Sequence, residues 1–266
     1  MKNYQEWEFL LDGCTQEFRH FSILPGTRFF SIYGGIDHYH DCPNDDFRMQ
    51  TVFVEGEDDP ELVWQVGHEL ISLYNGASRL YARDHLSASI YEIRKTDRSV
   101  PHSPPSGTFG LLGTPQAFSR EVLRDLEDGG ATHPKFRFIH FATELMDVYL
   151  ILKYLDMEAN WSTYYKMMET IKEVAKLHKV ELYFDEKEKD AFHNTANNFS
   201  IAGFDARHGF KHNVKANKTA KMDLSDGYTF VVNMAKEYFC KAELERRYAK
   251  AVSARLEKPS IDATST

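Results

Sequence analysis

The sequence predicts an α+β protein in which a small mixed region is followed by an all-helical region. Before residue 100, short segments with strand-like alternation accompany one amphipathic helix; after residue 116, apolar residues recur three and four positions apart. Between them, residues 100–115 (VPHSPPSGTFGLLGTP) contain four prolines and three glycines, which interrupt any helix or strand. We therefore expect an α+β domain at residues 1–99, a linker at 100–115 and a helical bundle at 116–249.

The N-terminal region combines strand-like segments with one clearly delimited helix. Alternation and β-branched content predict strands at residues 6–11, 28–33, 50–57 and 87–95. Asp59 followed by Pro60 is typical of an N-cap and a first helical position, so a helix is expected to begin there. Its apolar face comprises Leu62, Val66, Leu70, Leu73, Ala77 and Leu80. Helix capping also explains the acidic run GEDDPE at residues 56–61, for which a cation site is the alternative.

The C-terminal region is expected to form several amphipathic helices. Apolar stripes predict helices over residues 138–155, 161–175 and 228–242, and a shorter helix is expected from residue 186 to about residue 207. Short connections between such helices favour an antiparallel bundle. The last residues, 250–266, are expected to be a disordered tail.

The composition is that of an ordinary globular protein. Of the 266 residues, 42% are hydrophobic and 14% aromatic, which is enough to build a core. Cys14, Cys42 and Cys240 are odd in number and widely spaced, so they do not form a disulfide framework. The sequence opens with acidic residues where a signal peptide needs an apolar run, and its most apolar window, residues 148–155, is too short to span a bilayer. We therefore expect a cytoplasmic protein without a membrane partner.

Positive charge is concentrated in one short stretch of an acidic chain. The net charge is −8, which disfavours long-range attraction of nucleic acid. Residues 206–222, here called the basic segment, contain no acidic residue, two histidines (His208 and His212) and five basic side chains: Arg207, Lys211, Lys215, Lys218 and Lys221. Any contact with nucleic acid is therefore expected to be local to this segment.

The spacing of Arg207 and His212 limits how they can act together. On a continuous helix, five positions correspond to about 140° around the axis, so the two side chains would not share a face. Either the helix breaks near Gly209, or the side chains meet through a second subunit.

A helical bundle that carries R-x4-H, with a polar residue after the arginine, resembles the HEPN superfamily. RHGFKH, from Arg207 to His212, fits this pattern with His208 as the polar residue, and the resemblance covers roughly residues 116–249. It implies a metal-independent endoribonuclease that works as a homodimer and places an arginine and a histidine of each protomer in a shared cleft. It also implies a toxin or an effector of antiviral defence, with a cognate regulator or defence-system partner protein.

The residue types of the basic segment suit RNA cleavage without a metal. A histidine can take the proton of the 2′-OH or protonate the leaving 5′-oxygen, because its pKa lies near neutrality. A guanidinium stabilises the charge that develops on the phosphorus oxygens, and lysines hold the flanking backbone. We expect catalysis by Arg207 and His212 assisted by His208, RNA binding by Lys211, Lys215, Lys218 and Lys221, and 2′,3′-cyclic phosphate ends. The sequence contains no P-loop or dinucleotide fingerprint, and no cofactor is expected.

Other interpretations of the same residues remain open at this point. The basic segment suits a non-catalytic sensor or adaptor that binds RNA or protein, a structural partner that meets an acidic surface, or simply a solvated surface turn. His38, His40 and Cys42 alternate as zinc ligands do, although a polar loop explains them more simply. Trp161, Tyr164 and Tyr165 are typical of core packing or a dimer seam, with base stacking as the alternative.

Overall fold

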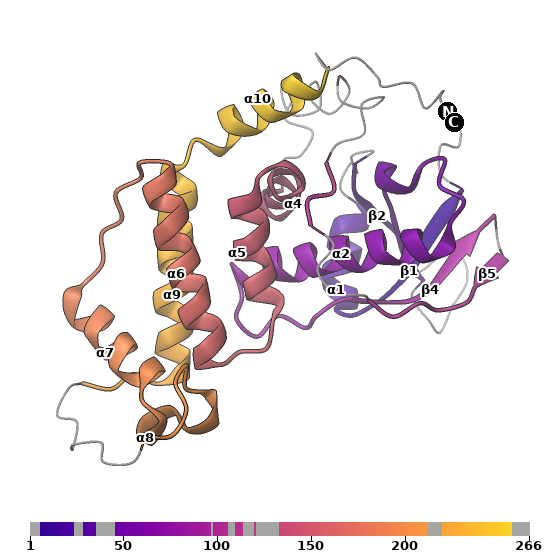
Figure 1. Ribbon diagram of the computed structural model, residues 1–266. Helices are drawn as coiled ribbons and strands as arrows, with labels where there is room; N and C mark the ends of the chain where they lie inside the picture. Colours follow the sequence, from indigo (N-terminus) through magenta and orange to yellow (C-terminus); the bar gives the residue numbers. More distant parts are fainter. Residues whose placement is uncertain are drawn as a thin grey trace, which may run out of the picture.

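The computed structural model has the predicted α+β architecture, with an antiparallel sheet in the N-terminal half and helices in the C-terminal half. It describes residues 6–23, 29–35, 46–96, 98–105, 110–113, 120, 133–211 and 220–256. In Figure 1 the sheet lies on one side with α2 across it, helices α6 and α9 lie on the other side, and α5 stands between them and α2. None of the helices in these ranges combines the length and the apolar character needed to cross a membrane.

The sheet consists of five antiparallel strands in the order β2-β3-β1-β4-β5. The strands are β1 (Trp7–Asp12), β2 (Ser31–Gly34), β3 (Phe47–Gln50), β4 (Ser89–Lys95) and β5 (Arg98–Val100). Strands therefore overlap the ranges expected at residues 6–11, 28–33 and 87–95, although β2 begins only at Ser31 and β4 at Ser89, and residue 28 lies outside the described residues. The strand expected at 50–57 is wrong, because β3 ends at Gln50 and a 3-10 turn, η1 (Val52–Val54), follows. The buried Thr51 causes this change: its hydroxyl donates to the Phe29 carbonyl (2.6 Å) and caps the turn.

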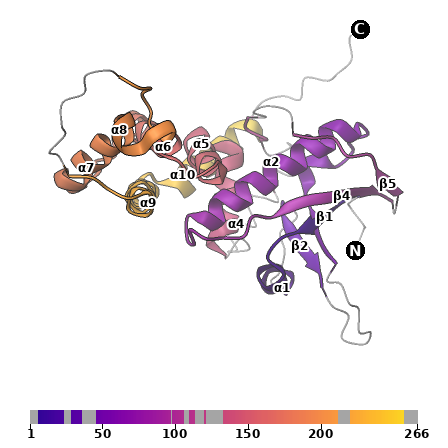
Figure 2. The same ribbon diagram turned by 90° about the horizontal axis from the view of Figure 1, so that it is seen from below.

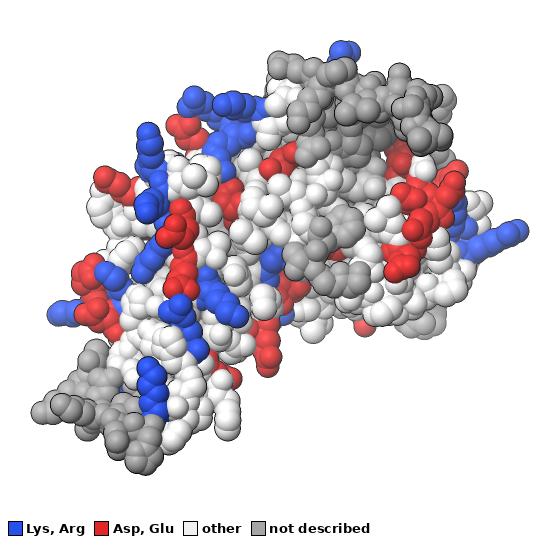
Figure 3. All heavy atoms as spheres, viewed as in Figure 1, with Lys and Arg blue, Asp and Glu red and all other residues white. Residues whose placement is uncertain are grey.

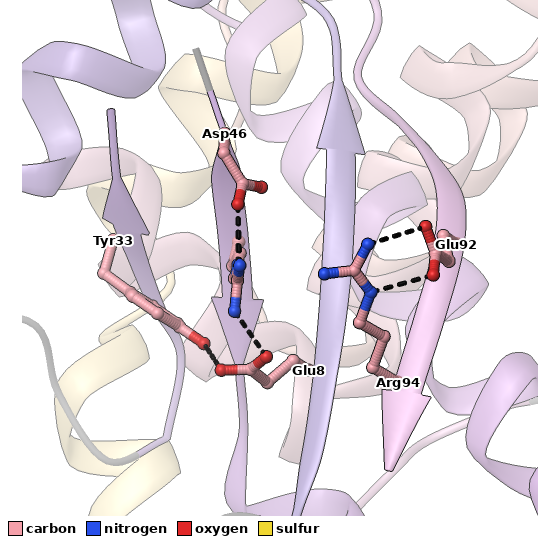
Figure 4. Close-up of polar contacts among 6 residues, drawn as sticks. Glu8, Tyr33, Asp46, Glu92 and Arg94 are labelled. Carbon is pink, nitrogen blue, oxygen red and sulfur yellow. Dashed lines mark hydrogen bonds and ion pairs between the residues drawn. The ribbon is translucent and has the colours of Figure 1, made fainter. Parts of the chain in front are cut away.

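The two faces of the sheet differ in character, as its alternating side chains require. Phe9 lies beside Met49 and Ile93 on one face, and all three are fully buried. The opposite face carries ion pairs and hydrogen bonds, shown in Figure 4. Arg48 binds Glu8 (2.6 Å) and Asp46 (2.7 Å), and the Tyr33 hydroxyl donates to Glu8 (2.6 Å). The cations of this network are therefore already matched by carboxylates within the sheet.

Helix α2 (Pro60–Arg79) connects the sheet to the helical half. It begins as predicted: the Asp59 carboxylate accepts from the Glu61 amide (2.9 Å), and Pro60 occupies the first turn. Capping therefore accounts for the acidic run before it. Two glycines on α2 lie nine positions apart, which places them on opposite faces of the helix. A Cβ at Gly67 would lie 2.4 Å from the Phe9 ring, and one at Gly76 would lie 2.1 Å from the Leu152 carbonyl oxygen.

Helix α1 (Thr15–Ser22) belongs to the N-terminal half, and the other described helices form the C-terminal half. They are α4 (Pro134–Glu144), α5 (Met146–Asp156), α6 (Trp161–Leu177), α7 (Glu186–Asn197), α8 (Phe199–Ala202), α9 (Leu224–Lys241) and α10 (Leu244–Leu256). In Figure 2, α6 and α9 lie apart from the sheet, with α5 between them and α2. Helices α5, α6 and α9 pack in that order, and α7 packs on α6.

One helix predicted from the sequence is two helices in the structure. The stripe over residues 138–155 is interrupted at Leu145, which has an extended backbone (φ −110°, ψ 109°) between α4 and α5. The carbonyl of Thr143 accepts from the amide of Gly113 (2.9 Å), a residue outside the helix. This bond takes the place of the helical one that would carry the chain through Leu145. A contact from residues 110–113 therefore marks the break, which the apolar periodicity does not show.

Helix α10 corrects the expected tail. Residues 250–256 continue α10, and Val252 is buried, so the prediction of disorder from residue 250 is wrong for these residues. A cluster around the buried Asp147 joins α10 to the bundle. Both terminal nitrogens of the Arg247 guanidinium donate to the Asp147 carboxylate (2.7 and 2.8 Å), and the Tyr238 hydroxyl donates to it as well (2.5 Å). Burial raises the pKa of Asp147, but the hydrogen bonds from Arg247 and Tyr238 lower it by more, so the pKa lies below its usual value.

The two halves share one core. Described parts of the expected linker pack on the helices: Trp64 donates to the Pro101 carbonyl (2.8 Å), His68 bonds the Ser103 carbonyl (2.9 Å) and the Gly110 amide donates to the Tyr149 hydroxyl (3.1 Å). The buried apolar cluster runs without interruption from the sheet through α2 to the bundle. The boundary between two domains stays a prediction.

The close approach at Gly76 generates a stability prediction. Gly→Ala in a helix interior normally stabilises by about 1 kcal/mol, but here the added methyl would meet the α5 backbone, and overpacking costs about 1–3 kcal/mol. We expect Gly76→Ala to lower the urea midpoint clearly. Gly209→Ala is the control and should leave the midpoint unchanged, because among the described residues no atom beyond its chain neighbours lies within 4 Å of the added Cβ. Equal midpoints for both variants would contradict the packing described here.

His140 on α4 is fully buried and stacks on Phe29 at 3.5 Å. Within the described ranges, neither of its ring nitrogens has a hydrogen-bond partner. Burial therefore lowers its pKa from 6.5 to about 3. Between these values the unfolded chain binds a proton that the folded chain does not, so His140 destabilises the fold progressively as pH falls below about 6.5.

We expect this residue to make stability depend on pH. Between about pH 7 and pH 5 the wild type should lose about 2 kcal/mol through His140, and His140→Leu should not lose that part. The measurement is urea unfolding of both proteins at several pH values, comparing slopes so that a constant packing difference cancels. Parallel profiles would show that His140 is not buried as a neutral ring.

Candidate functional site

The structure places part of the predicted site on one exposed surface. Arg207, His208, Lys211 and Lys221 are all exposed. His212, Lys215 and Lys218 lie outside the described residues. The helix expected to reach about residue 207 is wrong in its end: α7 stops at Asn197, and α8 and a 3-10 turn, η3 (Gly203–Asp205), follow. The chain therefore leaves helical geometry before Arg207, and the 140° separation does not apply.

Two consecutive asparagines end α7. The side-chain amide of Asn197 donates to the His193 carbonyl (2.9 Å), and that of Asn198 donates to the Asn194 carbonyl (2.6 Å). Asn198 itself has an extended backbone. Side chains that bind the carbonyls of the last turn replace the bonds that a continued helix would make. The local sequence thus ends α7 ten positions before the arginine.

The described ends of the basic segment are both held by the last turn of α7. The Arg207 amide donates to the Ala196 carbonyl (2.8 Å). The Met222 amide donates to the buried Thr195 hydroxyl (3.0 Å), and Asn194 donates to the Ala220 carbonyl (3.0 Å). Arg207 and Met222 are thereby fixed beside adjacent residues of one helix. The position of Arg207 is set by the fold, although its side chain is exposed.

The Arg207 guanidinium lies against α6. Its central carbon is 4.2 Å from the centroid of the Tyr165 ring, well within cation–π range, and one nitrogen is 3.1 Å from Glu169. Tyr165 and Glu169 are four positions apart and therefore share a face of α6. About a third of the Arg207 side chain (34%) remains exposed, so the guanidinium is oriented and still reachable. An anion that binds there would share the arginine with Glu169.

A histidine that the motif analysis did not single out contacts the same Tyr165 ring as this arginine. The ring of His193, on α7, meets the edge of Tyr165 at 5.4 Å and 87°. Its Nε2 is 3.4 Å from the Lys172 ammonium, which can only donate, so this nitrogen accepts. Burial, followed by Lys172 and Lys189, lowers the pKa of His193. A lowered pKa favours the neutral imidazole, which is the form that a general base needs.

No spacing rule identifies His193 from the sequence. It precedes Arg207 by fourteen positions and belongs to no motif with it. Both residues contact the Tyr165 ring because α7 packs on α6. Tertiary packing alone reveals this pair.

The aromatic residues of α6 are core residues. Trp161, Tyr164 and Tyr165 are 6%, 4% and 7% exposed, which confirms the packing interpretation and leaves no face for base stacking. Within the described ranges, no three His, Cys, Asp or Glu side chains are grouped closely enough to hold a metal ion. His38, His40 and Cys42 lie outside those ranges.

Charge is mixed over the face shown in Figure 3, where Lys and Arg alternate with Asp and Glu on the helical half. No single-sign field extends across that face. Attraction of a polyanion would therefore depend on the local cations of the basic segment, whose residues 206–222 contain no acid.

The hydrogen bond from the Met222 amide to Thr195 generates a prediction about local stability. Thr195→Val keeps the shape of the side chain but leaves the Met222 amide without its buried acceptor, at a cost of about 1–3 kcal/mol. We expect the Met222 amide to exchange with deuterium about tenfold faster or more. Thr170→Val on α6, whose hydroxyl donates to the Lys166 carbonyl, is the control. Equal protection of Met222 in both variants would rule out this anchor.

Comparison with known proteins adds no assignment to these observations. No protein-family model, curated protein or solved structure matches the chain. The resemblance of RHGFKH to the HEPN motif therefore stays a prediction, and the functional argument depends on the residues and contacts described above.

Proposed function

We propose that this protein is a metal-independent endoribonuclease whose basic segment contacts RNA. The observation that carries the proposal is that Arg207 is held in a fixed orientation and remains accessible. Its backbone is fixed on α7, its guanidinium is oriented by Tyr165 and Glu169, and a third of the side chain stays open to solvent. An arginine held in place yet reachable is the group that stabilises a phosphate as negative charge develops on it.

The reaction needs two proton transfers and no redox step. A base removes the 2′-OH proton, the 2′-oxygen attacks phosphorus, and the bond to the 5′-oxygen breaks as an acid protonates that oxygen. The products are a 2′,3′-cyclic phosphate and a 5′-hydroxyl. His212 is assigned from the R-x4-H pattern, and His208, next to Arg207, assists. His193, whose pKa is lowered by burial and which contacts the Tyr165 ring, is a further candidate for the base.

The partners follow from the HEPN resemblance and belong to the proposal. They are an RNA substrate, a second copy of the chain that completes the cleft, and a cognate regulator or defence-system protein. A role as toxin or antiviral effector rests on the same resemblance. Lys211 and Lys221, both exposed, would hold the flanking phosphates together with Lys215 and Lys218.

One observation favours a second function, that of a non-catalytic RNA or protein binder. Glu169 already pairs with the Arg207 guanidinium at 3.1 Å. A carboxylate at that distance reduces the net charge available to a transition state, whereas a binding surface tolerates such a pair. The two functions differ in whether His212 matters more than the lysines.

The test is cleavage of total RNA by the purified protein in excess EDTA. Wild type should give fragments with cyclic-phosphate ends. Arg207→Ala and His212→Ala should each lower the rate about 10²–10³-fold, because each removes a group that acts in the transition state. Arg98→Ala, which removes an exposed arginine on the edge strand β5, is the matched control and should cleave as wild type does.

The outcomes separate the two functions. Cleavage that survives Arg207→Ala and His212→Ala would refute the nuclease assignment. RNA binding without cleavage, lost on removal of the lysines but kept in His212→Ala, would establish the binder instead.

A further inference from the structure

Two phenylalanines on either side of Arg207 project into solvent. Phe204 is 97% exposed and Phe210 is 71% exposed, the first of these being almost the full area of the side chain. Each lies three positions from Arg207. Large aromatic side chains are mostly buried in folded proteins, and an exposed aromatic cluster that also carries charge marks a binding surface.

The two rings share one aromatic neighbour. Both meet the ring of Phe199 edge-on, Phe204 at 5.5 Å and 82° and Phe210 at 5.8 Å and 81°. Phe199 begins α8, so the pair is attached to a helix that packs on α7. Gly203, with φ 61°, turns the chain just before Phe204, a conformation that residues with a side chain rarely adopt. The backbone geometry therefore directs Phe204 away from the core.

The charges around these rings are mainly positive. Arg207 and Lys211 are exposed on the same short stretch, and Lys221 is exposed where the basic segment returns to α7. The nearby acids are Asp205, which is exposed, and Glu169, which is engaged with Arg207. Rings interleaved with cations suit a ligand that combines flat apolar groups with negative charge.

We propose that Phe204 and Phe210 form a base-stacking platform for single-stranded RNA beside Arg207. This inference rests on the proposed function, since it names the substrate class of the same site. Unpaired bases would stack on the two rings while Arg207 and Lys211 contact the phosphates between them. Base stacking of this kind is tolerant of sequence, so the platform selects unpaired nucleotides rather than particular bases.

Charge decides between RNA and the other occupant of an apolar surface, a second copy of the chain. If the rings of two copies packed directly on one another, Arg207 and Lys211 would meet their own counterparts with no anion between them, and like charges brought together in this way oppose association. In the shared cleft of the proposed homodimer, by contrast, the phosphates of the RNA lie between the cations of the two copies. Double-stranded RNA also fits poorly, because its bases are stacked on one another and present no free faces.

The test is binding of a fluorescent, unstructured RNA of about ten nucleotides whose sugars are 2′-O-methylated, so that binding is measured without cleavage. Phe204→Ala and Phe210→Ala should each weaken affinity about tenfold, with an unchanged salt dependence, because no phosphate contact is lost. Lys211→Gln should instead reduce the slope of log Kd against log salt by about 0.7. Phe204→Trp should retain binding, and its added indole fluorescence should be quenched by the RNA.

Two matched controls accompany these variants. Tyr91→Ala removes an exposed aromatic (55%) from strand β4 and should bind as wild type does. An abasic strand of equal length should bind wild type weakly and be insensitive to Phe204→Ala. Equal losses with the normal and the abasic strand, or failure of wild type to bind the methylated RNA, would overturn the platform.

The remaining outcomes distinguish this proposal from the nuclease. Binding of the methylated RNA through both rings, without cleavage of ordinary RNA, keeps the platform and rejects the nuclease. If ordinary RNA is cleaved and both phenylalanine variants bind the methylated RNA as tightly as wild type, the nuclease is kept and the platform is rejected. Unchanged RNA affinity combined with loss of a dimer in sedimentation by Phe204→Ala would assign the rings to a second copy and reject the platform.

Discussion

The close approach of other elements to both faces of α2 is the constraint on which the fold depends. Gly67 allows Phe9 of the sheet to contact one face, and Gly76 allows the backbone of α5 to contact the other. Each site excludes even a methyl group, so α2 fixes the distance from the sheet to α5. Helices α6 and α9 build outward from α5, and α7 packs on α6. The position of the candidate site is therefore linked through α2 to the sheet.

The candidate site is assembled at the end of α7 rather than along a helix. Asn197 and Asn198 end that helix, and its last turn then holds the amides of Arg207 and Met222. These bonds fix the position of both described ends of the basic segment although the segment is not helical there. A catalytic or binding group that is already in position acts without the cost of being ordered first. It also brings α6 into the site, because Tyr165 contacts both Arg207 and His193.

Electrostatics and aromatic exposure point to the same surface. The chain is acidic, its charges are mixed over the bundle in Figure 3, and the sheet matches Arg48 with its own carboxylates. The basic segment differs because it contains no acid of its own, although Glu169 pairs with its Arg207, and because it is preceded by Phe204, which is almost fully exposed. A ligand with planar groups and negative charge satisfies both features, whereas an acidic protein surface would satisfy only the first.

The sequence by itself determined the fold class, the start of α2 at Asp59 and Pro60, and the concentration of charge at residues 206–222, since these depend on local composition, capping and apolar period. It did not determine the break at Leu145, which a bond from Gly113 marks, or the partners of Arg207. Tyr165 and Glu169 contact that arginine, and His193 contacts the same Tyr165 ring, only because α6 and α7 pack together. Contacts between residues far apart in the chain leave no periodic or spacing signal, so only the tertiary structure decided them.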